Sequence, residues 1–180
     1  MTPRERDEYR ALRATIRTRG TARVSVFLAG LGIWAGLAIA TAALLPVPSA
    51  TLVPLVLLAG TFESVFALHV GVERVGRYLQ VFHDDDWEQA AMAFGPPLAG
   101  TGSDPLFVIL FGVATFLNFL PVLVAESVPT EFIVVGTAHA LFLGRLVVAR
   151  QAVRRQRAAD LQRFQELHTV RRNANIDPNN

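Results

Sequence analysis

The chain has 180 residues, of which 52% are hydrophobic, and its formal net charge is +2. It contains no cysteine, which excludes disulfides, thiolate metal sites and cysteine nucleophiles. The apolar residues are concentrated in four runs of roughly twenty residues, and a run of that length can cross the hydrocarbon core of a bilayer, which is about 30 Å thick. The sequence therefore predicts an all-α integral membrane protein with four transmembrane helices arranged as two hairpins.

The first segment, residues 1–23, is predicted to be an Arg-rich amphipathic helix that precedes the membrane. Thr2 and Pro3 fit a helix start, with a threonine cap and a proline at the first helical position. The first transmembrane helix is expected over residues 24–45. Its apolar run is about 22 residues long, against about 7–15 for the core of a cleaved signal peptide, so we interpret it as a membrane span.

Prolines follow residue 45 and end the first span, and Ser49 is expected to cap a second span over residues 49–72. Residues 73–104 are the acidic loop between the hairpins; the second helix is expected to continue into it as far as about residue 82, and the acidic run 83–88 follows. Such a cluster of carboxylates could bind a hard divalent cation, but the run lacks the spaced ligands and the glycine of an EF-hand loop. We interpret it as a helix cap and as an acidic complement to the Arg-rich terminal segments.

Two further spans are predicted over residues 105–125 and 131–149, so the transmembrane domain covers residues 24–149. No helix breaker separates the fourth span from the Arg-rich segment 150–172. We therefore expect one continuous helix of about 40 residues, roughly 60 Å long. Its second half would project from the bilayer as an amphipathic cytoplasmic helix. The last eight residues, 173–180, are expected to be disordered.

The distribution of arginine predicts the orientation. Seven of the 17 arginines lie in residues 1–23, two lie in 73–104 and eight lie in 145–180, whereas the short turns between paired spans contain none. The positive-inside rule then places both termini and the middle loop in the cytoplasm, with the spans in the inner (cytoplasmic) membrane. We expect these arginines to contact anionic lipid headgroups. Nucleic acid is not expected as a partner, because membrane orientation already accounts for the arginines.

Four ionisable residues lie within the predicted spans: Glu63, His69, His139 and Arg145. A charge at the centre of a transmembrane helix costs about 2.5–3.5 kcal/mol, so such side chains tend to face the protein interior and to find partners. Counted along the helices, Glu63 falls between His139 and Arg145 in depth, and either residue could be its partner. The cluster could be a proton or ion site, or an ion pair that fixes packing. His69 lies nearer the cytoplasm and can pair with Glu73 one turn later.

No cofactor or metal is expected. Haem ligation by two histidines needs both rings at a similar depth, but His69 and His139 differ by about 15 Å along their helices. The sequence also contains nothing that resembles a phosphate loop, a zinc signature or a nucleophile elbow. It therefore favours a protein that is not an enzyme.

The first span carries Gly32, Gly36 and Ala40 at four-residue spacing. Small residues at this spacing let helix backbones approach closely. The pattern fits packing within the chain and packing between copies equally well.

These features favour a non-enzymatic assembly or accessory subunit that associates with itself or with a larger membrane complex. The turns outside the membrane are minimal and the cytoplasmic side is elaborated. The alternative is a small oligomeric channel or proton-coupled transporter that uses Glu63, His139 and Arg145. Loss of flux in a Glu63→Gln variant would distinguish the two.

Overall fold

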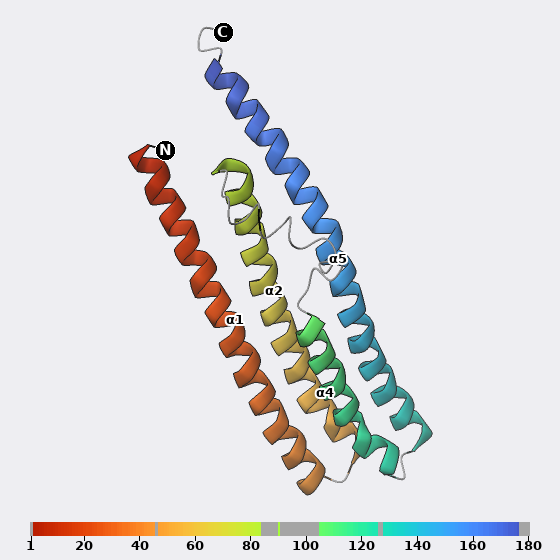
Figure 1. Cartoon of the computed structure of the whole chain (residues 1–180). Helices are drawn as coiled ribbons and strands as arrows, with labels where there is room; N and C mark the ends of the chain where they lie inside the picture. Colours follow the sequence, from red (N-terminus) through yellow and green to blue (C-terminus); the bar gives the residue numbers. More distant parts are fainter. Residues whose placement is uncertain (1, 46, 84–89, 91–104, 126–127, 177–180) are drawn as a thin grey trace.

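The computed structural model describes residues 2–45, 47–83, 90, 105–125 and 128–176. Every regular element in these ranges is a helix: α1 (Pro3–Leu44), the short 3₁₀ helix η1 (Pro48–Thr51), α2 (Leu52–Phe82), α4 (Pro105–Val124) and α5 (Pro129–Ile176) (Figure 1). The segments Pro3–Leu44, Pro48–Phe82 and Pro129–Asn173 are long and apolar enough to cross a membrane, and Val108–Val124 is a shorter apolar helix. The predicted all-helical fold is therefore confirmed. Three of its helices are long enough to span a membrane.

Helix α1 begins as the sequence predicts. The Thr2 hydroxyl accepts a hydrogen bond from the Glu5 backbone N–H, and the Glu5 carboxylate accepts one from the Thr2 N–H. The helix then runs unbroken for 42 residues, so nothing separates residues 1–23 from the expected first span. Gly20 does not interrupt it, because one glycine in a helix interior costs only about 1 kcal/mol.

The structure differs from the sequence prediction at two helix ends. Ser49 does not cap α2, because η1 precedes that helix and the Ser49 backbone N–H donates instead to Glu131 Oε1 at 2.8 Å. This bond ties the start of α5 to η1. Helix α5 continues to Ile176, so residues 173–176 of the expected disordered tail are helical. The acidic positions 84–88 and residues 177–180 lie outside the described residues.

Phe62 of α2 lies at the centre of the core, where all four long elements meet. Its ring makes edge-on contacts with the rings of Phe111 of α4 and Phe142 of α5, with ring centroids 5.2 Å and 6.0 Å apart, respectively. Phe27 of α1 contacts Phe111 at 5.7 Å. Aromatic pairs in these geometries add stabilisation beyond their buried area, so this cluster fixes the order of the helices in the bundle.

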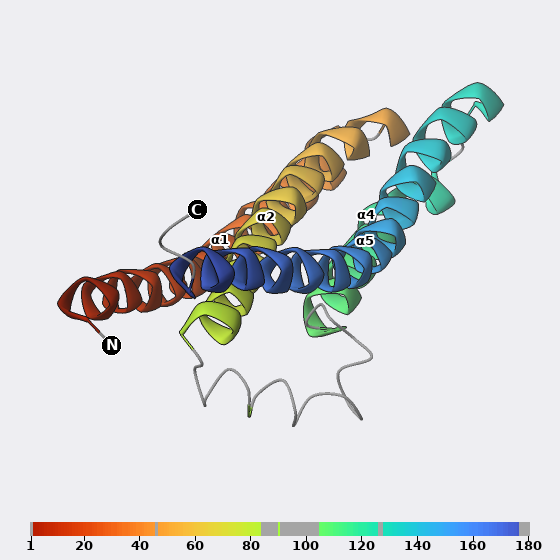
Figure 2. The same ribbon diagram turned by 90° about the horizontal axis from the view of Figure 1, so that it is seen from above.

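Both termini lie at one end of the bundle, here called the terminal end, and the opposite end is called the turn end (Figure 1). Helices α2 and α5 run in the same direction and α1 runs against them, while the short α4 covers only the half nearer the turn end. Viewed from above, the C-terminal half of α5 crosses over α2 toward α1 (Figure 2). The terminal end is therefore built from α1, α2 and α5.

Candidate functional site

Glu63 and Arg145 form a two-point ion pair between α2 and α5. Arg145 Nε lies 2.7 Å from Glu63 Oε1, and Arg145 Nη2 donates to Glu63 Oε2 at 2.8 Å. The guanidinium also lies over the Phe66 ring, 5.2 Å from its centroid. Bidentate, charge-assisted bonds of this kind are among the strongest hydrogen bonds in proteins. Arg145 is thus one of the two partners that the depth argument allowed for Glu63.

This ion pair lies within the apolar stretches of α2 and α5 and yet is not enclosed by the described part of the chain. Glu63 is about 18 Å along α2 from Thr51 at 1.5 Å per residue. The side chains of Arg145 and Glu63 are 38% and 47% exposed, respectively. Helical side chains lean toward the helix N-terminus, which for α2 and α5 is the turn end. We therefore expect both charged groups to stay within the apolar stretch rather than to reach past its terminal end.

His139 does not join this pair. Its Nε2 lies 3.0 Å from Asn118 Nδ2, and its Nδ1 lies 2.8 Å from the Val135 carbonyl oxygen. Asn118 Nδ2 also donates to the Thr51 carbonyl at 2.9 Å. Because a carbonyl only accepts, these contacts place the imidazole proton on Nδ1 and leave Nε2 as the acceptor for Asn118. Every polar atom of the buried ring is satisfied in the neutral form, so the ring is suited to hold α4, α5 and η1 together.

His69 is also separate from Glu63. Arg23 Nη1 of α1 lies 2.8 Å from His69 Nδ1, and His69 Nε2 lies 3.5 Å from Glu73 Oε1. The expected contact with Glu73 is therefore present. The contact with Arg23 was not anticipated, because it joins residues 46 positions apart.

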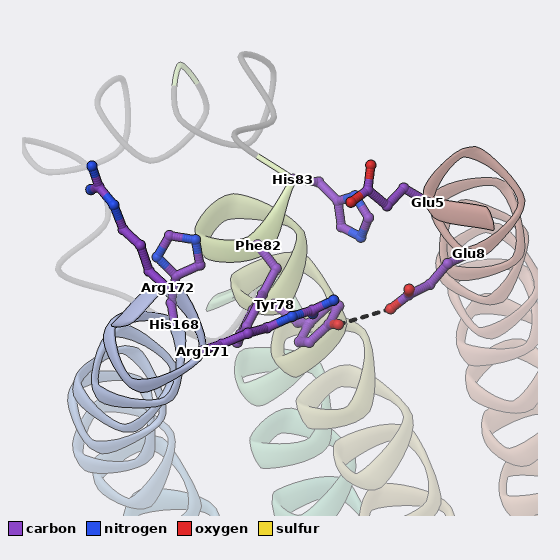
Figure 3. A pocket seen from close by; sticks show the side chains of 8 residues that line it. All are labelled: Glu5, Glu8, Tyr78, Phe82, His83, His168, Arg171 and Arg172. Carbon is purple, nitrogen blue, oxygen red and sulfur yellow. Dashed lines mark hydrogen bonds between the residues drawn. The ribbon is translucent and has the colours of Figure 1, made fainter. Parts of the chain in front are cut away.

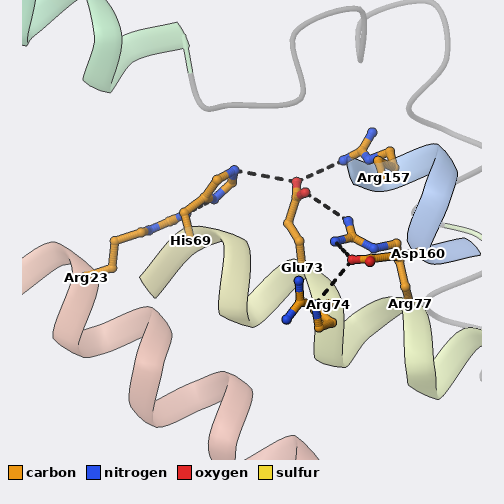
Figure 4. Close-up of polar contacts among 7 residues, drawn as sticks. All are labelled: Arg23, His69, Glu73, Arg74, Arg77, Arg157 and Asp160. Carbon is orange, nitrogen blue, oxygen red and sulfur yellow. Dashed lines mark hydrogen bonds and ion pairs between the residues drawn. The ribbon is translucent and has the colours of Figure 1, made fainter. Parts of the chain in front are cut away.

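A group of charged residues joins α2 to α5 toward the terminal end (Figure 4). Arg77 donates to Glu73 Oε2 at 3.0 Å and to Asp160 Oδ2 at 2.9 Å. Arg157 donates to Glu73 Oε1 at 2.9 Å, and Arg74 Nε lies 3.3 Å from Asp160 Oδ2. We call these five residues the terminal network. The Arg77 side chain is only 1% exposed, so its buried charge is stabilised mainly by the carboxylates of Glu73 and Asp160.

A groove of about 330 Å³ lies beyond this network, between the ends of α1, α2 and α5 (Figure 3). Tyr78 donates to Glu8 Oε1 at 2.8 Å across it and stacks on Phe82 at 4.5 Å. Burial of the phenol, followed by its hydrogen bond to Glu8, raises the pKa of Tyr78. The backbone hydrogen bond from Thr2 lowers the pKa of Glu5, on the same side of the groove. The Glu5 carboxylate therefore caps the start of α1, and the Glu8 carboxylate joins α1 to α2.

Of the stripe Gly32, Gly36 and Ala40, the two glycines make no close contact with the described part of the chain. A Cβ atom added at Gly32 or Gly36 would meet no atom of the described structure within 4 Å. The close approach between α1 and α2 occurs instead at Gly30, where an added Cβ would lie 2.9 Å from Thr61 Cβ. In the described part of the chain, Gly32 and Gly36 lie on an open face of α1, whereas Ala40 is partly buried.

Reasoning from the sequence considered only the ionisable groups inside the apolar runs. It therefore missed two kinds of residue that make contacts between helices. Asn118 was missed because an amide carries no charge, although a lone Asn within an apolar run is itself a signal. Arg77 and Asp160 were missed because they lie outside the runs and 83 positions apart. Among the described residues, no three or more His, Asp or Glu side chains are grouped closely enough to hold a metal ion. Comparison with protein-family models, with curated proteins and with solved structures gave no match.

Proposed function

We propose that this protein is a non-enzymatic assembly subunit of the inner (cytoplasmic) membrane. Its four apolar helices cross the bilayer as two hairpins, α1 with α2 and α4 with α5. Both termini lie in the cytoplasm, so the terminal end is the cytoplasmic end. The support for this orientation is the arginine distribution, because the turns at the other end contain no arginine.

The observation that carries the proposal is the exposure of the Glu63–Arg145 ion pair at bilayer depth. Charged side chains inside a membrane face protein or a water-filled cavity, because lipid tails offer no hydrogen-bond partner. In the described chain this pair faces outward, with 47% of Glu63 exposed. A further protein surface that covers it would remove the cost of contact with lipid. The pair is therefore best explained as part of an interface.

The terminal network supports the same function. Its ion pairs join α2 to α5. The contact between Arg23 and His69 joins α1 to α2. Beyond the predicted spans, α2 and α5 thus form a stalk held by buried and partly buried ion pairs, and α1 is tied to them through His69, near the cytoplasmic end of the second predicted span. A stalk fixed in this way presents a constant cytoplasmic surface, which suits a subunit that positions other proteins.

The transporter alternative draws on the same partly exposed Glu63. Two features argue against it. Glu63 is held by Arg145 through both carboxylate oxygens. His139 is satisfied as a neutral ring by other residues, which argues against a proton relay between the two groups.

Native mass spectrometry of the protein, extracted from its own membranes in mild detergent, tests the proposal. We expect assemblies that contain more than one polypeptide, either further copies or foreign subunits. A population that is monomeric at every detergent concentration would contradict the proposal. Purified protein in liposomes should show no proton or ion flux, and flux that disappears in Glu63→Gln would favour the transporter.

A further inference from the structure

We infer that the surface around Glu63 and Arg145 is a two-fold interface with a second copy of this chain. This inference rests on the proposed function, which requires some protein to cover the pair, and it names that protein. The surface consists of exposed residues and the partly exposed Arg145 on one side of α2 and α5, here called the ion-pair face: Val56, Gly60, Glu63, Ser64 and Ala67 of α2, with Leu141, Arg145 and Val148 of α5.

The α2 side of this face permits close approach by another helix. Gly60 and Ser64 are four residues apart, and Ala67 follows on the same side. A Cβ added at Gly60 would meet no described atom within 4 Å. The Ser64 hydroxyl is satisfied by the Gly60 carbonyl at 2.9 Å, so it adds no unpaired polar group. Small residues in this arrangement let two membrane helices pack backbone to backbone.

The remaining hydrogen-bonding capacity of the ion pair selects the partner. Arg145 uses its Nε and an Nη2 hydrogen on Glu63, and within the described ranges its other guanidinium hydrogens remain available as donors. The Glu63 carboxylate likewise keeps lone pairs beyond the two contacts. The face therefore offers donors and acceptors side by side at one depth, and it needs a partner that offers both at that same depth.

A second copy related by a two-fold axis meets this requirement by symmetry. In such an isologous contact the same patch of each copy faces the other, so the Arg145 of one copy can lie beside the Glu63 of its partner. The two ion pairs then form a closed group of four alternating charges. A lipid chain offers neither donors nor acceptors. The open stripe of α1 at Gly32 and Gly36 is apolar, so lipid can cover it without such a cost.

The natural lack of cysteine makes disulfide crosslinking a direct test. Single cysteines at Gly60, Ser64 and Ala67 would be introduced into the full-length protein and oxidised in native membranes. Leu28→Cys is the matched control. Leu28 is exposed on α1 and lies on the same helix face as Ala35 and Ile39, which border α4. We expect crosslinked dimers from the α2 positions and none above background from Leu28→Cys. The reverse pattern would overturn the inference.

A steric variant tests the same face without crosslinking. Ser64→Phe adds a ring where lipid could accept it but a closely packed helix could not. We expect its dimer dissociation constant in mild detergent to rise roughly tenfold or more, which corresponds to about 1.4 kcal/mol, with the helical circular dichroism unchanged. Leu28→Phe should dimerise as the wild type does. Equal dimerisation of Ser64→Phe and wild type would overturn the inference.

The failure of this inference and the failure of the proposed function give different results. One copy of the chain bound to foreign subunits would overturn the two-fold interface and keep the assembly function. Dimers that crosslink through α1 rather than α2 would do the same. A protein that is monomeric in its own membranes would overturn both.

Discussion

The burial of Arg77 predicts that its removal weakens the terminal end of the bundle and leaves the rest intact. The Arg77 side chain is 1% exposed and contacts both Glu73 and Asp160. Removing one member of a buried ion pair costs about 3–5 kcal/mol, because the other charge is left buried and unpaired. Here Glu73 retains Arg157 and Asp160 retains Arg74. We therefore expect Arg77→Met to cost about 2–3 kcal/mol, below that range.

Hydrogen exchange read by mass spectrometry measures this effect locally. The opening free energy of α2 and α5 near the terminal network should fall by the stated amount, while helices around Phe62 should exchange as in the wild type. Arg10→Met is the matched control. Arg10 faces Asp7 at 3.9 Å with both side chains 78% exposed, and such surface pairs contribute at most about 1 kcal/mol.

Two results would refute the reasoning. In the first, Arg77→Met exchanges like the control, within about 0.5 kcal/mol, which would show that the network does not hold the helices together. Alternatively, protection around Phe62 could fall as much as protection at the terminal end. The loss would then be global, and the terminal end would not be a separately stabilised unit.

The remaining predictions concern three other contacts. The raised pKa of Tyr78 means that the folded protein holds the phenol proton after the unfolded chain has lost it. Stability should therefore fall as pH rises through the ordinary tyrosine value of about 10, and Glu8→Gln should lower the pKa of Tyr78 in a tyrosinate absorbance titration. Asn118→Leu removes the donor to His139 and should cost about 1–3 kcal/mol of unfolding free energy in detergent. Gly30→Ala places a Cβ of α1 against the Thr61 side chain of α2. It should lower the free energy of unfolding by about 1–3 kcal/mol in the same assay.

Each of these predictions has a control and a contradicting result. Tyr9→Phe removes the other tyrosine signal, since the chain has two tyrosines, and an unshifted titration after Glu8→Gln would exclude the proposed hydrogen bond. For Asn118, adding His139→Leu should recover part of the loss, and simple additivity of the two changes would exclude their coupling. Gly32→Ala is the control for Gly30→Ala, and equal stability of the two variants would place the close approach elsewhere.

Sequence reasoning predicted the helices well because long apolar helices are specified by local length and hydropathy. The apolar runs and the capping residues Thr2 and Pro3 each act within a few positions. Partner choice is not local in this way. The depth count left His139 and Arg145 open as partners of Glu63, because it gives the position along a helix axis but not the side of the helix that faces a neighbour.

The same limitation explains the stripe on α1. Spacing identified Gly32 and Gly36 as small residues on one side of a helix, but spacing does not say which side meets α2. Gly30 lies two positions earlier on the opposite side and makes the contact with Thr61. Only the three-dimensional arrangement distinguishes a glycine needed inside the chain from one on an open face.

The charged contacts between α2 and α5 do more than satisfy individual groups, because together they set how far one helix is shifted along the other. Glu63 and Arg145 are 82 positions apart, Arg77 and Asp160 are 83 apart, and Glu73 and Arg157 are 84 apart. Apolar packing is not directional, and between helices in lipid it gains little from the hydrophobic effect. A slip of one helical turn, about 5.4 Å, would preserve much of the apolar contact but separate all three ion pairs. The three ion pairs therefore all favour one register between α2 and α5, on which both the proposed stalk and the ion-pair face depend.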